Sequence, residues 1–161
     1  MPDAKTSSLP LDQNYHPVGG TDYLVAERTV VFDGATADDP GEFDGANAEY
    51  DLFTVTGPIA CKILAVCGTL LEGASATLEV GTAATTAGLI ALTTATAIDA
   101  NELWHDATPD ASVEASTVLT EKIVTQNIQQ KVATADITAG TITYYLLWRP
   151  LSADANVTPT A

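Results

Sequence analysis

One short segment of the chain concentrates the side chains that could do chemistry. It reads LWHDATPDAS over residues 103–112 and directly follows an acidic residue, Glu102. Its reactive side chains are His105, Asp106, Asp110 and Ser112. An imidazole, carboxylates and a hydroxyl within so short a stretch are the groups of a metal site or of a hydrolytic triad.

A metal site would combine the imidazole nitrogen of this segment with nearby carboxylate oxygens. The candidate ligands are Glu102, His105, Asp106 and Asp110. A calcium loop of the EF-hand type needs oxygen ligands at alternate positions around a glycine. Here a tryptophan, an alanine and a proline interrupt the run. We therefore expect a structural loop that binds no metal.

A hydrolytic triad would need a serine on a strained turn within reach of a histidine. Ser112 and His105 are close in sequence, but the chain contains no GxSxG motif. The glycine motifs that bind phosphates are absent from the sequence as well. Acidic residues are so plentiful that a pair of carboxylates for glycoside cleavage has no selective signal. We expect no catalytic residue and no cofactor.

The same segment has the ordinary chemistry of a turn. The side chains of Asp106 and Asp110 can bond backbone N–H groups one or two positions on, and Pro109 fixes a backbone angle. We expect Trp104 to pack this loop against the body of the protein rather than to bind a ligand.

Composition argues against several classes of function. The 161 residues fit one domain with a single core. A formal net charge of -15 disfavours binding to the phosphates of nucleic acids. The first residues are polar and interrupted by proline and glycine, which indicates neither a secretory signal nor a membrane anchor. Cys61 and Cys67 lie six residues apart in one extended run, so we expect them to be buried without a disulfide between them.

The elements that position these residues are expected to be strands. Short runs rich in Val, Ile, Leu and Thr are separated by Gly, Asp, Asn and Pro. The expected strands cover residues 23–32, 50–56, 59–71, 76–81, 89–94, 117–125, 128–133 and 141–149. This spacing predicts an all-β fold, an antiparallel β-sandwich or jelly roll. Residues 1–22 would form an extended N-terminal arm, residues 23–151 the sandwich and residues 152–161 a loose polar tail.

Two patterns compete over residues 113–133. Val124, Ile128 and Val132 fit the i, i+4 spacing of a helix and also the even spacing of a strand. The β-branched content favours strands, with a break near residues 126–127.

The last expected strand, TITYYLLWRPL, has two different faces. One face holds Ile142, Tyr144, Leu146 and Trp148, and the other holds Thr143, Tyr145, Leu147 and Arg149. The first face is expected to be core. Tyr145 and Leu147 make the second face too apolar for free solvent, so we expect it to contact another layer or a second copy of the chain. In the arm, Leu11 and Tyr15 are candidate anchors to a partner.

Three longer stretches resemble small virion proteins of tailed bacteriophages, of the capsid decoration or cement type. They read TVTGPIACKILAVCGTLL, ATLEVGTAATTAGLIALTTATAIDANELWHDATPDASVE and ADITAGTITYYLLWRPLSADANV, and the similar region spans about residues 52–155. The resemblance implies a β-sandwich subunit, commonly trimeric, on the outer capsid surface of the virion. There it would bind the major capsid protein and reinforce the expanded head. A head-fibre, tail-associated or glycan-binding host-recognition module is the alternative.

Overall fold

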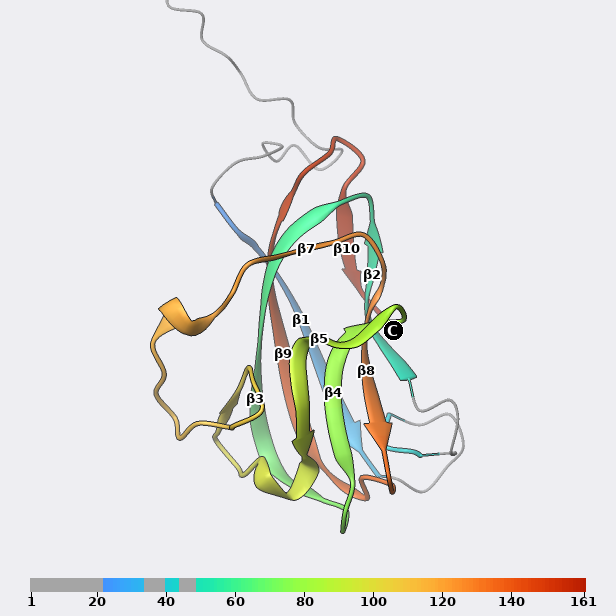
Figure 1. The fold of residues 1–161 in the computed structure, drawn as a ribbon, viewed down its shortest axis with the longest axis vertical. Coiled ribbons are helices and arrows are strands. Elements are labelled where there is room, and N and C mark those ends of the chain that lie inside the picture. Colours follow the sequence, from blue (N-terminus) through green and yellow to red (C-terminus); the bar gives the residue numbers. More distant parts are fainter. Residues whose placement is uncertain (1–21, 34–39, 44–48) are drawn as a thin grey trace, which may run out of the picture.

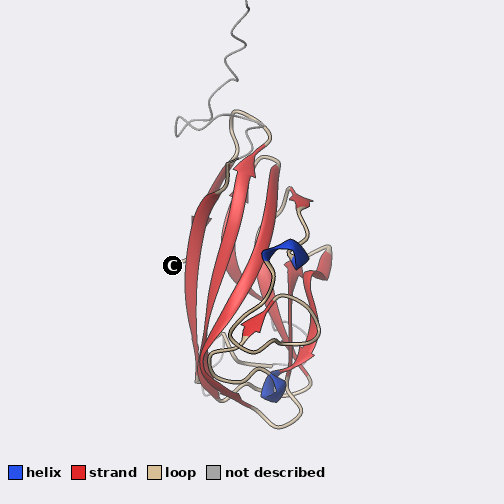
Figure 2. Ribbon diagram, turned by 90° about the vertical axis from the view of Figure 1, so that its left-hand side faces the viewer, coloured by secondary structure: helices blue, strands red, loops and turns tan. Residues whose placement is uncertain are grey.

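The protein folds into antiparallel β-sheets. The computed structural model describes residues 22–33, 40–43 and 49–161. The strands are β1 (Leu24–Phe32), β2 (Glu49–Thr56), β3 (Ile59–Glu72), β4 (Thr77–Thr82), β5 (Thr85–Thr94), β6 (Leu103–Trp104), β7 (Lys122–Val124), β8 (Ile128–Ala133), β9 (Ala139–Pro150) and β10 (Asn156–Pro159). Within these ranges the only helical segments are two single-turn 3-10 helices, η1 (Ala95–Ala97) and η2 (Ser116–Val118) (Figures 1 and 2). The all-β prediction is confirmed.

The strands of the described ranges form two five-stranded sheets. The first has the order β1-β9-β3-β6, with β7 also paired to β3, and the second has the order β10-β2-β8-β4-β5. Every pairing is antiparallel. Buried side chains from both sheets belong to one hydrophobic cluster, with Trp104 and Tyr144 from the first sheet and Phe53, Leu78 and Ile128 from the second. Figure 1 shows β4 and β5 of the second sheet in front of β1.

Strand β9 is central in the first sheet and buries one face. It pairs with β1 along one side and with β3 along the other. Its buried side chains are Ile142, Tyr144, Leu146 and Trp148, and the residues between them are half-buried. This alternation confirms the predicted core face, because successive side chains of a strand point to opposite sides of the sheet.

Buried polar groups connect the two sheets. The hydroxyl of Tyr144 on β9 donates to Oε1 of Gln130 on β8 over 2.9 Å. The amide nitrogen of Gln130 donates in turn to the carbonyl of Pro40 over 2.6 Å. The ring of Trp104 lies 6.3 Å from the ring of Tyr144, centroid to centroid. The core therefore encloses a hydrogen-bonded polar chain beside the contact between these two rings.

Residues 113–133 differ in part from the prediction. The helical alternative is wrong, and so is the first half of the strand expected over 117–125, where the chain instead forms η2. Strand β6 already occupies the edge of β3 beside Ala65 and Val66, so this later segment joins that edge only as β7. The predicted break near 126–127 is confirmed. There the side chain of Asn127 accepts the N–H of Val55 and donates to Asp51, each over 3.1 Å.

The expectation of a loose C-terminal tail is wrong for its last part. Residues Asn156–Pro159 form β10, which pairs with β2. Ala155 and Val157 are buried in the core cluster, and the guanidinium of Arg28 donates to the carbonyl of Ala161 over 3.0 Å. The edge of β2 pairs with this strand, and Ala155 and Val157 pack into the core beside it.

Three further expectations concern the cysteines, the N-terminal arm and a membrane anchor. Cys61 and Cys67 are buried and free, as predicted. Burial raises the pKa of the Cys61 thiol to about 12 and that of Cys67 to about 11. The arm was expected over residues 1–22, and all of it but the last residue, including Leu11 and Tyr15, lies outside the described ranges. No helix in the described part of the chain is long and apolar enough to span a membrane.

Candidate functional site

A β-bridge closes the segment 103–110 into a loop. The N–H of Leu103 donates to the carbonyl of Asp110 over 2.9 Å, and the N–H of Asp110 donates back to Leu103 over 2.8 Å. Leu103 and Trp104 form β6, which pairs with Val66 and Ala65 of β3. The loop therefore projects from the edge of the first sheet.

Trp104 anchors this loop in the core. Its side chain is fully buried. Its indole N–H donates over 2.9 Å to the hydroxyl oxygen of Thr93, which lies on β5 in the opposite sheet. The predicted packing role is confirmed, and the anchor holds the loop to both sheets.

Asp106 shapes the turn as predicted, whereas the side chain of Asp110 contacts the imidazole of His105. Oδ1 of Asp106 accepts the backbone N–H of Thr108 over 2.7 Å, which is an Asx turn. The carbonyl of Asp106 lies 3.2 Å from the Thr93 hydroxyl. The loop backbone is thus fixed by its own side chain and by β5.

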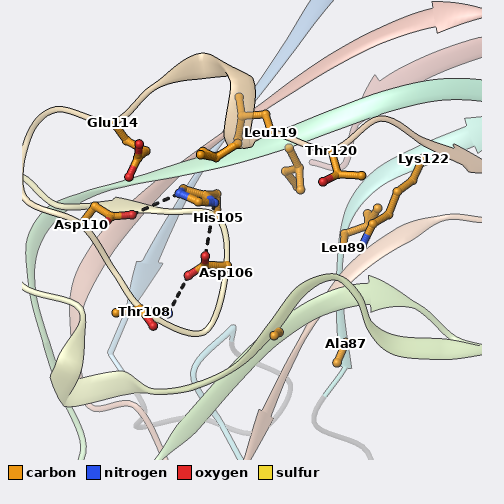
Figure 3. Close-up of a pocket in the computed structure, with 13 residues that line it drawn as sticks. Ala87, Leu89, His105, Asp106, Thr108, Asp110, Glu114, Leu119, Thr120 and Lys122 are labelled. Carbon is orange, nitrogen blue, oxygen red and sulfur yellow. Dashed lines mark hydrogen bonds and ion pairs between the residues drawn. The ribbon is translucent and has the colours of Figure 1, made fainter.

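His105 lies between carboxylates (Figure 3). Its Nε2 is 3.1 Å from Oδ2 of Asp110, and its Nδ1 is 3.9 Å from Oδ2 of Asp106. The imidazole side chain is only 6% exposed. Glu114 and Asp110 lie on one side of the ring and Asp106 on the other. One ligand atom each from His105, Asp110 and Glu114 lie within 4.8 Å of one another.

A cavity of about 380 Å³ opens beside these residues. Ile63 of β3 and Leu89 of β5 form part of its apolar wall, and His105 and its carboxylates form a polar end. A second cavity of about 380 Å³ shares Leu89 and Lys122 with the first. The Lys122 ammonium donates to the carbonyl of Gly88, which bridges β7 to the β5 side of the fold.

The structure separates the predicted ligands into two groups. His105, Asp106 and Asp110 come together, whereas the carboxylate of Glu102 accepts the N–H of Asp99 over 2.8 Å. Glu114 joins the cluster, although the sequence pattern does not point to it. The sequence shows only that Glu114 is acidic and lies four residues after Asp110. It lies in a loop, where no periodic pattern predicts the direction of the side chain.

The arrangement does not provide a base for Ser112. That serine is exposed. Both ring nitrogens of His105 face carboxylates, at 3.1 Å and 3.9 Å. A nucleophilic hydroxyl needs a free imidazole nitrogen within hydrogen-bond reach. The described contacts therefore pair His105 with carboxylates and not with Ser112.

A second polar cluster surrounds Glu121. The guanidinium of Arg149 donates to its two carboxylate oxygens over 2.8 Å and 3.1 Å, and the hydroxyl of Tyr23 donates to Oε2. The hydrogen bonds from Arg149 and Tyr23 lower the pKa of Glu121 to about 2. The carboxylate raises the pKa of both partners. These bonds hold the segment before β7 against β9 and the start of β1.

The outer face of the first sheet is the side of β1, β9 and β3 that points away from the core. The register places its residues in cross-strand rows, namely Val25, Leu147 and Lys62, then Glu27, Tyr145 and Leu64, then Thr29, Thr143 and Val66. Val25 is 65% exposed, and Val31 farther along β1 is 61% exposed. The two candidate interface residues, Tyr145 and Leu147, are half-buried in the centre of this outer face.

No family model, no curated protein and no solved structure matches the chain. The functional argument therefore depends on the loop, the cavities and the outer face.

Proposed function

We propose that this protein is a capsid decoration (cement) protein of a tailed bacteriophage. Its two sheets would form a jelly-roll-like β-sandwich, seated on the outer surface of the head. It binds the major capsid protein by non-covalent contacts and associates with itself, as a trimer in the state that the family resemblance implies. It works by burying surface and needs no cofactor, nucleic acid or membrane.

The observation that carries this proposal is the outer face of the first sheet. Its central strand presents Tyr145 and Leu147, with Val25 of β1 opposite Leu147 and Leu64 of β3 opposite Tyr145. Contiguous apolar side chains on a sheet face mark a surface that another protein covers. Tyrosine is also enriched in the cores of protein interfaces.

Threonines make the same face suitable for burial. The hydroxyls of Thr29 and Thr143 are 2.9 Å apart, and so are those of Thr69 and Thr141. Each pair shares a hydrogen bond across neighbouring strands. A polar group that is already hydrogen-bonded costs less to remove from water than a free one. Covering the face therefore removes from water hydroxyls that each already have one hydrogen-bond partner.

The charge of the chain supports an outer position on a virion. A net charge of -15 keeps free subunits soluble and apart from one another. The same charge repels packaged DNA, whose phosphates are also negative. Stabilisation of the shell follows from linkage, because a protein that binds only the assembled lattice shifts the equilibrium toward that lattice.

The burial of the tryptophans weakens the glycan-binding alternative. Trp104 is fully buried and Trp148 is 4% exposed. Neither ring can stack on a sugar without unfolding the core around it. The described residues thus favour a protein partner over a glycan.

The proposal is tested by rebinding to heads of the encoding phage that lack this protein. Leu147→Lys places a charge in the centre of the outer face, and we expect it to abolish binding. Val25→Lys repeats the test at a position that is 65% exposed, where the fold tolerates lysine. The matched control is Leu92→Lys, a 50% exposed leucine on β5 of the other sheet. Wild-type occupancy by both outer-face variants would contradict the proposal.

A further inference from the structure

We propose that His105, Asp110 and Glu114 bind a divalent transition-metal ion of the zinc class. The three residues offer one nitrogen and two oxygen ligands, whose atoms lie within 4.8 Å of one another. This inference is independent of capsid binding. It also departs from the sequence expectation of no metal, because only the folded loop brings Glu114 to the histidine.

The distances fit a metal after a small adjustment. Ligands about 2.1 Å from a tetrahedral zinc ion are about 3.4 Å from one another. Nε2 of His105 and Oδ2 of Asp110 are already 3.1 Å apart. Glu114 is an exposed residue, so its carboxylate can close the remaining gap by side-chain rotation. The ion would lie between Nε2 of His105 and Oδ2 of Asp110, in place of their direct contact.

The other side of the imidazole supports a ligand role. Metal-binding histidines usually direct their second ring nitrogen at a carboxylate or carbonyl, which fixes the ring and raises its basicity. Here Nδ1 of His105 faces Oδ2 of Asp106 at 3.9 Å, opposite the side of Asp110 and Glu114 (Figure 3). Asp106 is itself held in the Asx turn with Thr108. The second ring nitrogen therefore points toward a held carboxylate, at a distance longer than a direct hydrogen bond.

The surroundings give the ion access and charge balance. All three ligands line the cavity of about 380 Å³. Its volume leaves room for a water molecule as a fourth ligand. Two carboxylates neutralise a divalent cation. Calcium and magnesium prefer oxygen ligands alone, whereas an imidazole nitrogen selects zinc and its transition-metal neighbours.

The test is calorimetric titration of the chelator-treated, full-length protein with Zn²⁺. We expect one saturable site per chain. Glu114→Gln alters an exposed side chain and leaves the core intact, and it should weaken binding by at least about tenfold. His105→Ala should abolish the site. Calcium in large excess should not displace the zinc.

Two controls separate this site from general binding to an acidic surface. Glu102→Gln changes a nearby carboxylate that is bonded to the N–H of Asp99, so zinc affinity should not change. His16→Ala removes the other of the two histidines and should also leave the affinity unchanged. The proposal fails if no saturable site is found, if Glu114→Gln behaves like Glu102→Gln, if His16→Ala abolishes binding, or if calcium displaces the zinc.

Discussion

The indole N–H of Trp104 donates to the hydroxyl oxygen of Thr93 over 2.9 Å, between two fully or nearly fully buried side chains on opposite sheets. The same hydroxyl lies within hydrogen-bond distance of the Asp106 carbonyl. Thr93 thus holds both the side chain of Trp104 and the backbone of the loop at Asp106.

Thr93→Val should lower the free energy of unfolding by about 1–3 kcal/mol, because it leaves the buried indole N–H without an acceptor. The measurement is urea unfolding followed by fluorescence. Thr94→Val changes the next residue of β5, which is exposed, and should have little effect. Equal stabilities for the two variants would show that the Trp104 bond is not needed to hold the loop.

Tyr144→Phe should also destabilise the fold by about 1–3 kcal/mol, because the buried Gln130 loses the hydroxyl that donates to it. Tyr145→Phe is the matched control, since it removes the same hydroxyl one residue away on the outer face. Urea unfolding of the two variants measures the difference. Equal losses of unfolding free energy in Tyr145→Phe and Tyr144→Phe would show that the hydrogen bond to Gln130 does not stabilise the fold.

Glu121→Gln should lower the free energy of unfolding only slightly at pH 7, by less than about 1 kcal/mol, because the ion pair is near the surface. The folded pKa of about 2 lies below the ordinary value of 4.5. The contribution is therefore fully present above about pH 4.5 and is lost as the pH falls toward 2.

Thermal unfolding across this pH range measures the difference in melting temperature between wild type and Glu121→Gln. It should narrow as the pH falls, and a gap that widens would contradict the assignment. Glu27→Gln on β1, for which the structure gives no ion pair within the described residues, serves as the control for loss of one negative charge.

Cys61 and Cys67 should react slowly with thiol reagents in the native protein at pH 8, because burial limits access and raises both pKa values. Both should react rapidly after unfolding in urea. A colorimetric thiol assay compares the two states. Fast native reaction of either cysteine would show that the inner face of β3 opens readily.

Residues with a strict period of two were predictable from the sequence. The alternation of β9 was recognised because one buried face imposes it. Trp104 was correctly expected to be an anchor, since a large aromatic beside turn residues gains most from burial. Both features depend on neighbouring residues in the chain, and the sequence shows those neighbours directly.

Features that depend on distant strands were not predictable in the same way. The path of the segment before β7 follows from the place that β6 takes on the edge of β3. Glu114 reaches His105 only because of that path. The short β10 was hidden in a polar tail, because its pairing depends on the free edge of β2. Each of these outcomes is set by tertiary contacts rather than by local composition.

The central claim is binding to an assembled phage head, and saturation binding to heads without this protein tests it most directly. Sedimented heads are assayed for bound copies as the protein concentration rises. The account predicts a plateau at a fixed number of copies per expanded head, with much weaker binding to unexpanded heads. Binding that never saturates, or no binding to expanded heads at all, would contradict it.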